Sequence, residues 1–305
     1  MTMAKIQNHS ALPDWDVARW FHPRFLSEYV DRAIVLPDVC PAGIMPNGTV
    51  AVVRREWLDS FRFSDAIGDI GCAMSLAPID TTFDDLVPAW NELYRRLKAL
   101  DKTVLGSGNH FIDACVDEAG GLHVLVHVGS RMATEEKAAF RFAKDYKRFE
   151  DRAVANHDEI WQCVKAVLGG RQKPRSLPHD TVDLDGAWMI LRKGVTNSPA
   201  GGDVLIASSF DDVITVGTAK ASIHELGDSM SHGTGRKHGR GEAKEVPVDE
   251  QLLRRRIVIP DDLPSGSWRL EAPVHYRHSS EVVPLVDAHF DVTNRLTPVA
   301  FMGGF

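Results

Sequence analysis

Residues 105–131 read LGSGNHFIDACVDEAGGLHVLVHVGSR, and this stretch decides how the rest of the chain is interpreted. Residues 122–128 are apolar and rich in β-branched side chains, which predicts a strand that ends at Gly129. Two glycines in LGSGNH allow close approach of the backbone to a ligand, and Asn109 and His110 follow them directly. The stretch therefore places polar side chains that can bind metals in turns beside an apolar strand.

Short strands and long helices are predicted elsewhere, in an irregular order. Helical spacing of apolar residues covers 83–100 with Thr82 as a cap, and residues 134–168 are helical in composition, as one helix or two. Further strands are predicted at 32–36, 50–53, 188–191, 204–207 and 213–217. This order favours an α+β fold over a doubly wound sheet. Because no loop marks a boundary, we expect one domain over residues 1–305, with mixed or antiparallel sheets flanked by helices.

The composition excludes several classes of protein. The 305 residues are 44% apolar and 25% charged, which rules out intrinsic disorder. A net charge of −7 argues against a sequence-blind polyanion binder, so any contact with nucleic acid should be local. No stretch is apolar enough to span a bilayer, the first ten residues do not form a signal peptide, and the four cysteines form no close pair. We therefore expect a cytoplasmic protein that does not associate with membranes.

Candidate metal ligands recur in or beside glycine turns. Asp69 and Cys72 stand three apart in GDIGC, and each taken alone has an ordinary explanation as a turn aspartate or a small buried cysteine. The full set, read together, is Asp69, Cys72, His110, His127 and His179. Five ligands are too many for one tetrahedral site with an open position, but they suffice for two ions that share Cys72. Thiolate and imidazole ligands favour zinc, manganese or cobalt over magnesium.

A histidine in the segment SHGTGRKHGR suggests covalent catalysis. His232 lies in a glycine-rich loop, and Arg236 and Arg240 would face one direction if the segment turned helical. Arginines supply forked donors for phosphate, and a histidine beside them can act as a nucleophile on phosphorus. A solvated basic loop is the alternative interpretation. Further candidates for phosphate or nucleotide binding are Arg131, Lys193 and Ser209.

The ordered set PDVC, GDIGC, LGSGNHF, HVGSR, PHD, RKG and SHGTGR, between residues 37 and 236, resembles the RtcB family of tRNA-splicing RNA ligases. The resemblance implies an enzyme that depends on GTP and manganese. Such an enzyme joins an RNA 2′,3′-cyclic phosphate or 3′-phosphate end to a 5′-hydroxyl end through a histidine–GMP intermediate. It also implies two Mn²⁺ ions, for which Zn²⁺ or Co²⁺ could substitute, and RNA and GTP as partners. The need for a protein activator stays open.

The resemblance assigns a role to each candidate. His232 would be the guanylylated nucleophile, and Asp38 would orient it. The metal pair would be held by the five ligands named above. Nucleotide contacts would come from Asn109, Asp113, Ser209 and Arg236, with Asp113 at the position that reads guanine. Contacts to RNA or triphosphate would come from Arg131, Lys193 and Arg240.

The chain departs from the family pattern at several positions. Cys40 stands where a histidine is usual, residues 207–210 read ASSF instead of PGSM, and the sequence ends in GGF without the usual lysine. The segment between Arg131 and His179 is also shorter than in typical members. Two other functions therefore remain open: a divergent metal-dependent phosphodiesterase or hydrolase, and a catalytically silent metal-binding or RNA-binding homologue.

Overall fold

The computed structural model describes residues 5–58, 60–105, 110–129, 143–172 and 174–303. Its larger sheet has seven strands, and all of its pairs are antiparallel. The strand order is β11 (Asp203–Ile206), β12 (Ile214–Ala219), β14 (Phe290–Gly303), β5 (Phe111–Asp117), β6 (Leu122–Val128), β4 (Ala73–Pro78) and β7 (Arg175–Pro178). Strands β5 and β6 form a hairpin that places Phe111 opposite His127.

A second sheet has five strands, of which only β1 pairs in parallel with its neighbour. The order is β1 (Lys5–Asn8), β2 (Val30–Cys40), β3 (Asn47–Arg54), β9 (Trp188–Lys193) and β8 (Asp180–Asp185). Strands β10 (Val195–Asn197) and β13 (Ser229–Ser231) pair with each other as a two-stranded antiparallel ribbon. This ribbon leads directly into the loop that carries His232.

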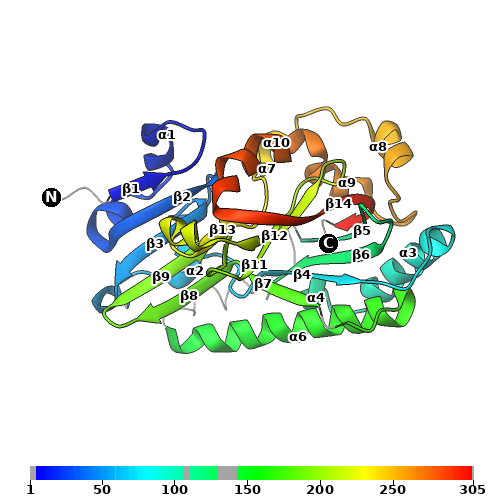
Figure 1. The fold of residues 1–305 in the computed structure, drawn as a ribbon, viewed down its shortest axis with the longest axis horizontal. Helices are drawn as coiled ribbons and strands as arrows, with labels where there is room; N and C mark the ends of the chain where they lie inside the picture. Colours follow the sequence, from blue (N-terminus) through cyan, green and yellow to red (C-terminus); the bar gives the residue numbers. More distant parts are fainter. Residues whose placement is uncertain (1–4, 59, 106–109, 130–142, 173, 304–305) are drawn as a thin grey trace.

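Two long helices, α3 (Phe83–Lys98) and α6 (Ala143–Leu168), cover one face of the larger sheet (Figure 1). Trp90 of α3 and Ile160 of α6 share a core with Val126 of β6, and all three are buried. The shorter helices are α1 (Asp14–Ala18), α2 (Phe63–Ala66), α4 (Lys102–Leu105), α7 (Arg240–Ala243), α8 (Glu250–Arg256), α9 (Ser265–Trp268) and α10 (Ser279–Val282). Within the described ranges, no helix is both long and apolar enough to cross a membrane.

The two large sheets pack against each other through a common apolar cluster. Ile34 of β2 and Val50 of β3 lie in it with Val204 of β11 and Phe290 of β14, and all four are buried. Because burying apolar surface is the main favourable term in folding, this shared core fixes one sheet relative to the other. The arrangement confirms the α+β class expected from the sequence.

The predicted helices and strands lie where the structure has them, but several of their lengths differ. The strand at 122–128 and the Thr82 cap are confirmed, and the Thr82 hydroxyl accepts a hydrogen bond from the Asp85 N–H. The strand predicted at 32–36 extends over Val30–Cys40, so Asp38 lies within β2. Of the helical stretch expected at 134–168, the described part is α6, and 130–142 lies outside the described residues. The long strand β14 was not predicted.

Candidate active site

A cavity of about 1050 Å³ lies where the two sheets meet, which is ample room for a nucleotide. Strands β2 and β9 line it from one sheet, and β4, β5 and β6 line it from the other. The predicted site residues that line this cavity are Asp38, Asp69, Cys72, His110, Asp113, His127, His179, Lys193, Ser209, His232 and Arg236. Asn109 and Arg131 lie outside the described residues, as does the side chain of Arg240.

Five side chains converge at one end of the cavity in two groups that share Cys72. The potential ligand atoms of Cys72, His127 and His179 all lie within 4.8 Å of one another, as do those of Asp69, Cys72 and His110. The Cys72 Sγ is 3.4 Å from Nε2 of His110 and 3.4 Å from Nε2 of His127. The sequence suggested that two ions share Cys72, but it did not divide the other four ligands between them.

The local backbone explains how these side chains meet. His110 and His127 come from adjacent positions of the β5–β6 hairpin, where one histidine precedes β5 and the other lies near the end of β6. A Cβ atom at Gly129 would lie 2.5 Å from Oδ2 of Asp69, so only glycine lets that carboxylate approach the strand end. The α6 side chains of Asn156 and His157 hold the Gly129 and Val128 carbonyls, at 3.0 and 2.8 Å.

The electrostatics of the cluster favour a bound cation. Burial, together with the neighbouring imidazoles, lowers the pKa of His127 and of His179 well below the ordinary value, so both rings are neutral. Their Nε2 atoms nevertheless lie only 3.2 Å apart. One of these nitrogens can donate its proton to the other, and a cation bound by both would replace that proton, since neutral imidazole is the metal-binding form. Burial, followed by Asp69 and Asp180, raises the pKa of the Cys72 thiol well above its ordinary value, so an ion must displace a proton to bind there.

The ring of His110 is oriented by a contact at Nδ1, the nitrogen that faces away from the cluster, as is usual for metal-binding histidines. Its Nδ1 lies 3.3 Å from the Leu105 carbonyl, while its Nε2 faces Cys72 and, at 3.0 Å, Asp69. A carbonyl at Nδ1 fixes the tautomer that leaves Nε2 free to coordinate. The two groups of side chains could therefore each hold a metal ion, and their thiolate and imidazole donors are ones that zinc and manganese accept.

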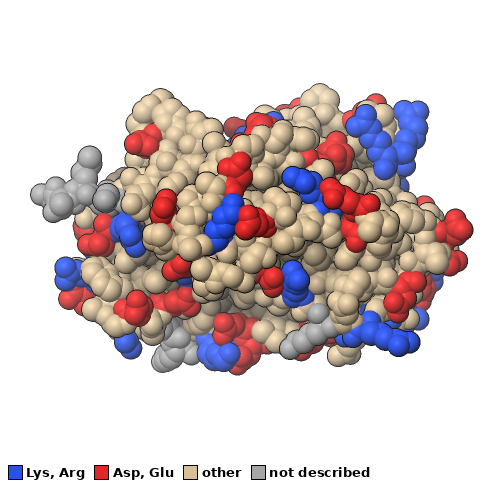
Figure 2. Space-filling model, in the orientation of Figure 1, with Lys and Arg blue, Asp and Glu red and all other residues tan. Residues whose placement is uncertain are grey.

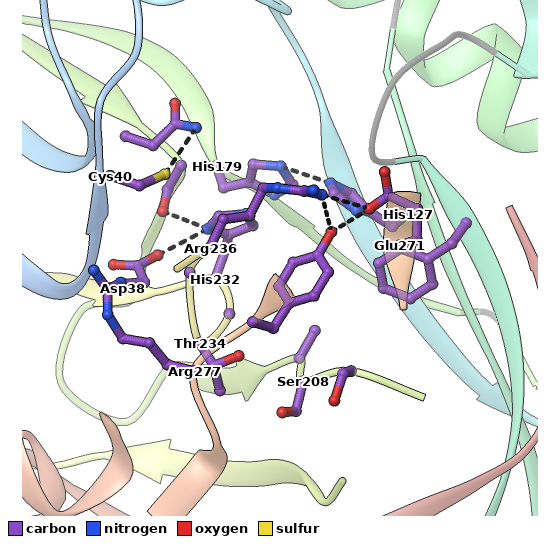
Figure 3. A pocket seen from close by; sticks show the side chains of 18 of the residues that line it. Asp38, Cys40, His127, His179, Ser208, His232, Thr234, Arg236, Glu271 and Arg277 are labelled. Atoms are coloured by element: carbon purple, nitrogen blue, oxygen red, sulfur yellow. Dashed lines mark hydrogen bonds and ion pairs between the residues drawn. The ribbon is translucent and has the colours of Figure 1, made fainter. Parts of the chain in front are cut away.

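His232 lies beside this cluster. Its ring stacks on the ring of His179, with centroids 4.5 Å apart and planes inclined by 26°. Its Nδ1 is 3.0 Å from Oδ2 of Asp38 and 2.6 Å from the carbonyl of Gly194 (Figure 3). Burial lowers the pKa of His232, but the hydrogen bond and charge of Asp38, the charge of Asp180 and the Gly194 carbonyl together raise that pKa above the ordinary value.

Two further predicted residues place buried ionisable groups in the cavity wall. Burial lowers the pKa of Lys193 to about 8, and its Nζ donates to the Ala42 carbonyl at 3.1 Å. Asp113 is 1% exposed, burial raises the pKa of its carboxyl well above the ordinary value, and its Oδ1 has no hydrogen-bond partner among the described residues. A buried acceptor without a partner is costly unless a ligand supplies the donor.

The guanidinium of Arg236 donates its hydrogen bonds to other groups of the same chain. Its Nη1 donates to Oε2 of Glu271 at 3.1 Å and to the Tyr276 hydroxyl at 2.8 Å, and its Nη2 donates to the Leu270 carbonyl at 2.7 Å. The helical arrangement that would have aligned Arg236 with Arg240 does not form, because Arg236 bridges to Tyr276 in extended form and α7 begins only at Arg240. Ser209 likewise donates to Asp211, at 3.1 Å.

Sequence reasoning missed four residues of the site. Asp180 and Gly194 stand inside the quoted motifs PHD and RKG, but nothing in those letters showed that they contact each other. Glu271 and Tyr276 come from the C-terminal part of the chain, beyond the last of the quoted motifs. His123, by contrast, pairs with Asp117 across the hairpin at 2.9 Å, as expected for a structural histidine.

Lysines and arginines are interspersed with acidic residues over the face shown in Figure 2, without a continuous basic surface. Comparison with models of known protein families and with the sequences of curated proteins gives no match for this chain.

Proposed function

We propose that the protein is an RNA ligase of the RtcB type, which joins RNA 3′-phosphate or 2′,3′-cyclic phosphate ends to 5′-hydroxyl ends with GTP as cofactor. The observation that carries the proposal is the placement of His232. A histidine with two acceptors at Nδ1 keeps its proton there, which leaves the Nε2 lone pair for attack. This nucleophile is stacked on His179, a member of the metal-competent cluster.

In the proposed first step, Nε2 of His232 attacks the α-phosphorus of GTP. An N–P bond forms, the bond to the bridging oxygen breaks, and pyrophosphate leaves. The RNA 3′-phosphate then takes the GMP from His232, and the 5′-hydroxyl oxygen attacks the activated 3′-phosphorus as GMP leaves. A cyclic phosphate end is first opened by water.

Protein side chains would support these steps from several sides. The buried ammonium of Lys193 lies in the cavity wall, where it can balance charge on phosphoryl oxygens. Once it gives up its proton, the Asp113 carboxylate can accept hydrogen bonds from N1 and N2 of guanine, which adenine does not offer. Two divalent ions held by the cluster would supply Lewis-acid stabilisation of the phosphoryl oxygens.

The direct test uses the whole protein with Mn²⁺ and GTP labelled at the α-phosphate. We expect label on the protein that is stable to alkali and labile to acid, as a histidine phosphoramidate is, with release of pyrophosphate. Addition of an RNA with a 2′,3′-cyclic phosphate and a second RNA with a 5′-hydroxyl should then give a joined product. Absence of both label and joined RNA in metal-loaded protein would contradict the proposal.

A second candidate function is hydrolysis of a phosphodiester. The engagement of Arg236 with Glu271 and Tyr276 favours it, because that guanidinium is then less available to a triphosphate. The same assay separates the two functions. Phosphate ester cleavage without protein label would identify a hydrolase.

A further inference from the structure

The nucleophile candidate has a second orienting group besides Asp38. The Gly194 carbonyl oxygen lies 2.6 Å from Nδ1 of His232, closer than the 3.0 Å to Asp38. Both groups can only accept, so the Nδ1–H is shared between them. The orientation and tautomer of His232 therefore depend on where the Gly194 peptide is held.

Gly194 cannot be replaced without loss of this contact. Its φ is +61°, in the left-handed region, and a Cβ atom there would lie 3.1 Å from Cε1 of His232. The backbone on either side is also tied, because the Val195 N–H donates to the His179 carbonyl at 2.9 Å. Gly194 thus links the turn that carries His179 to the ring of His232.

The side chain of Asp180 fixes this glycine. Its Oδ1 accepts the Gly194 N–H at 2.7 Å, and the residue is only 8% exposed. The Asp180 backbone is anchored in turn, since its carbonyl accepts the Gly71 N–H at 3.1 Å. A short, largely buried hydrogen bond from the N–H of a left-handed glycine to a carboxylate holds the adjoining carbonyl in place.

We propose that Asp180 is a positioning residue for His232 and acts through Gly194, so that the nucleophile is oriented by two independent supports, Asp38 and Asp180. The expected effect on labelling by GTP rests on the proposed function, whereas the expected effect on the tautomer of His232 does not. Since the Gly194 carbonyl can accept the Nδ1 proton alone, loss of the Asp38 charge should leave the tautomer in place. Loss of Asp180 alone should let the ring move from its reacting position, whereas the tautomer should change only when both supports are lost.

The kinetic test compares Asp180→Ala with the conservative Asp180→Asn, which keeps a carbonyl oxygen for the Gly194 N–H. Asp180→Ala should slow labelling by GTP about 10-fold to 100-fold at saturating GTP, as misplacement of a reacting group does, with little change in the GTP concentration for half-maximal rate. Asp180→Asn should recover most of the rate, and both variants should bind as many metal ions as the wild type. Equal rates in the alanine and wild-type proteins, no recovery in the asparagine variant, or loss of metal from either variant would overturn the proposal.

A structural measurement keeps the proposal testable if no guanylylation is found at all. Nitrogen-15 spectra of zinc-loaded protein report whether the His232 proton resides on Nδ1. We expect the Nδ1–H tautomer in the wild type and in Asp38→Asn, and a mixture of tautomers in folded Asp38→Asn/Asp180→Ala. A mixture already present in Asp38→Asn, or an unchanged tautomer in the double variant, would contradict the two-support arrangement, whether or not the protein is a ligase.

Discussion

The metal-competent end of the cavity and the end that contains Arg236 differ in how their polar groups are used. At the metal end, His110 is anchored through Nδ1 to the Leu105 carbonyl and turns its Nε2 toward Cys72. At the other end, Arg236 directs its guanidinium at Glu271 and Tyr276 of its own chain. The first arrangement is ready for a ligand, whereas the second is already satisfied by the protein.

A sequence motif can therefore retain a residue whose contacts in the fold differ from those that the motif implies. Arg236 ties the loop of His232 to the C-terminal segment, and Lys237 strengthens the link because its N–H donates to the His275 carbonyl at 2.7 Å. The loop is therefore positioned by the arginine that the motif assigns to nucleotide binding. The predictions below test the two ends separately.

The largest expected effect is at the boundary between the two ends. His232→Ala should abolish labelling by GTP while both metal ions stay bound, because the attacking nitrogen is lost and no ligand is removed. His238→Ala is the matched control in the same loop and should retain labelling within about twofold. Label in His232→Ala would place the nucleophile elsewhere.

At the metal end, Cys72→Ala should weaken binding of at least one ion by about 100-fold or more, since its Sγ belongs to both ligand groups. Cys115→Ala, a buried cysteine of β5 outside both groups, should bind metal normally. Calorimetric titration with Zn²⁺ and elemental analysis measure both. Full occupancy in Cys72→Ala would exclude a shared thiolate.

At the end that contains Arg236, Glu271→Gln should lower the free energy of unfolding by about 3 kcal/mol, because it removes one charge of a buried pair. Glu281→Gln is a matched control, since the Glu281–Lys237 pair on the same loop is about half exposed and should be worth less than about 1 kcal/mol. Urea unfolding of the three proteins gives both values. Equal stabilities would show that Arg236 does not anchor the loop.

The smallest expected effect concerns Asp113. Its carboxyl has a pKa raised by burial, so the folded state holds a proton that the unfolded chain has lost, and stability falls as the pH rises above the ordinary carboxyl value. Asp113→Asn should therefore stabilise the protein by on the order of 1 kcal/mol at pH 7.5, and by less at pH 4.5.

The same variant should lose its preference for GTP over ATP, because asparagine offers one acceptor where the carboxylate offers two. Calorimetry with both nucleotides measures this. An unchanged preference would assign guanine recognition to another group.

The sequence alone predicts those features of the fold and of the site that depend on neighbouring residues. An apolar, β-branched run located β6, which contains His127, and glycine turns located the segment that carries Cys72, because these signals are local. Contacts made at long range left no such signal. The bond from Asp180 to Gly194, the pairing of Arg236 with Glu271 and the place of β14 between β12 and β5 depend on how distant segments pack.

The central claim is that His232 forms a covalent bond to GMP. The most direct measurement is peptide mapping by mass spectrometry, under alkaline conditions, of wild-type protein incubated with Mn²⁺ and GTP. The account predicts a GMP adduct on the peptide that contains His232, with fragments that place it on that side chain. An adduct on any other residue, or none on protein shown to carry its metal ions, would contradict it.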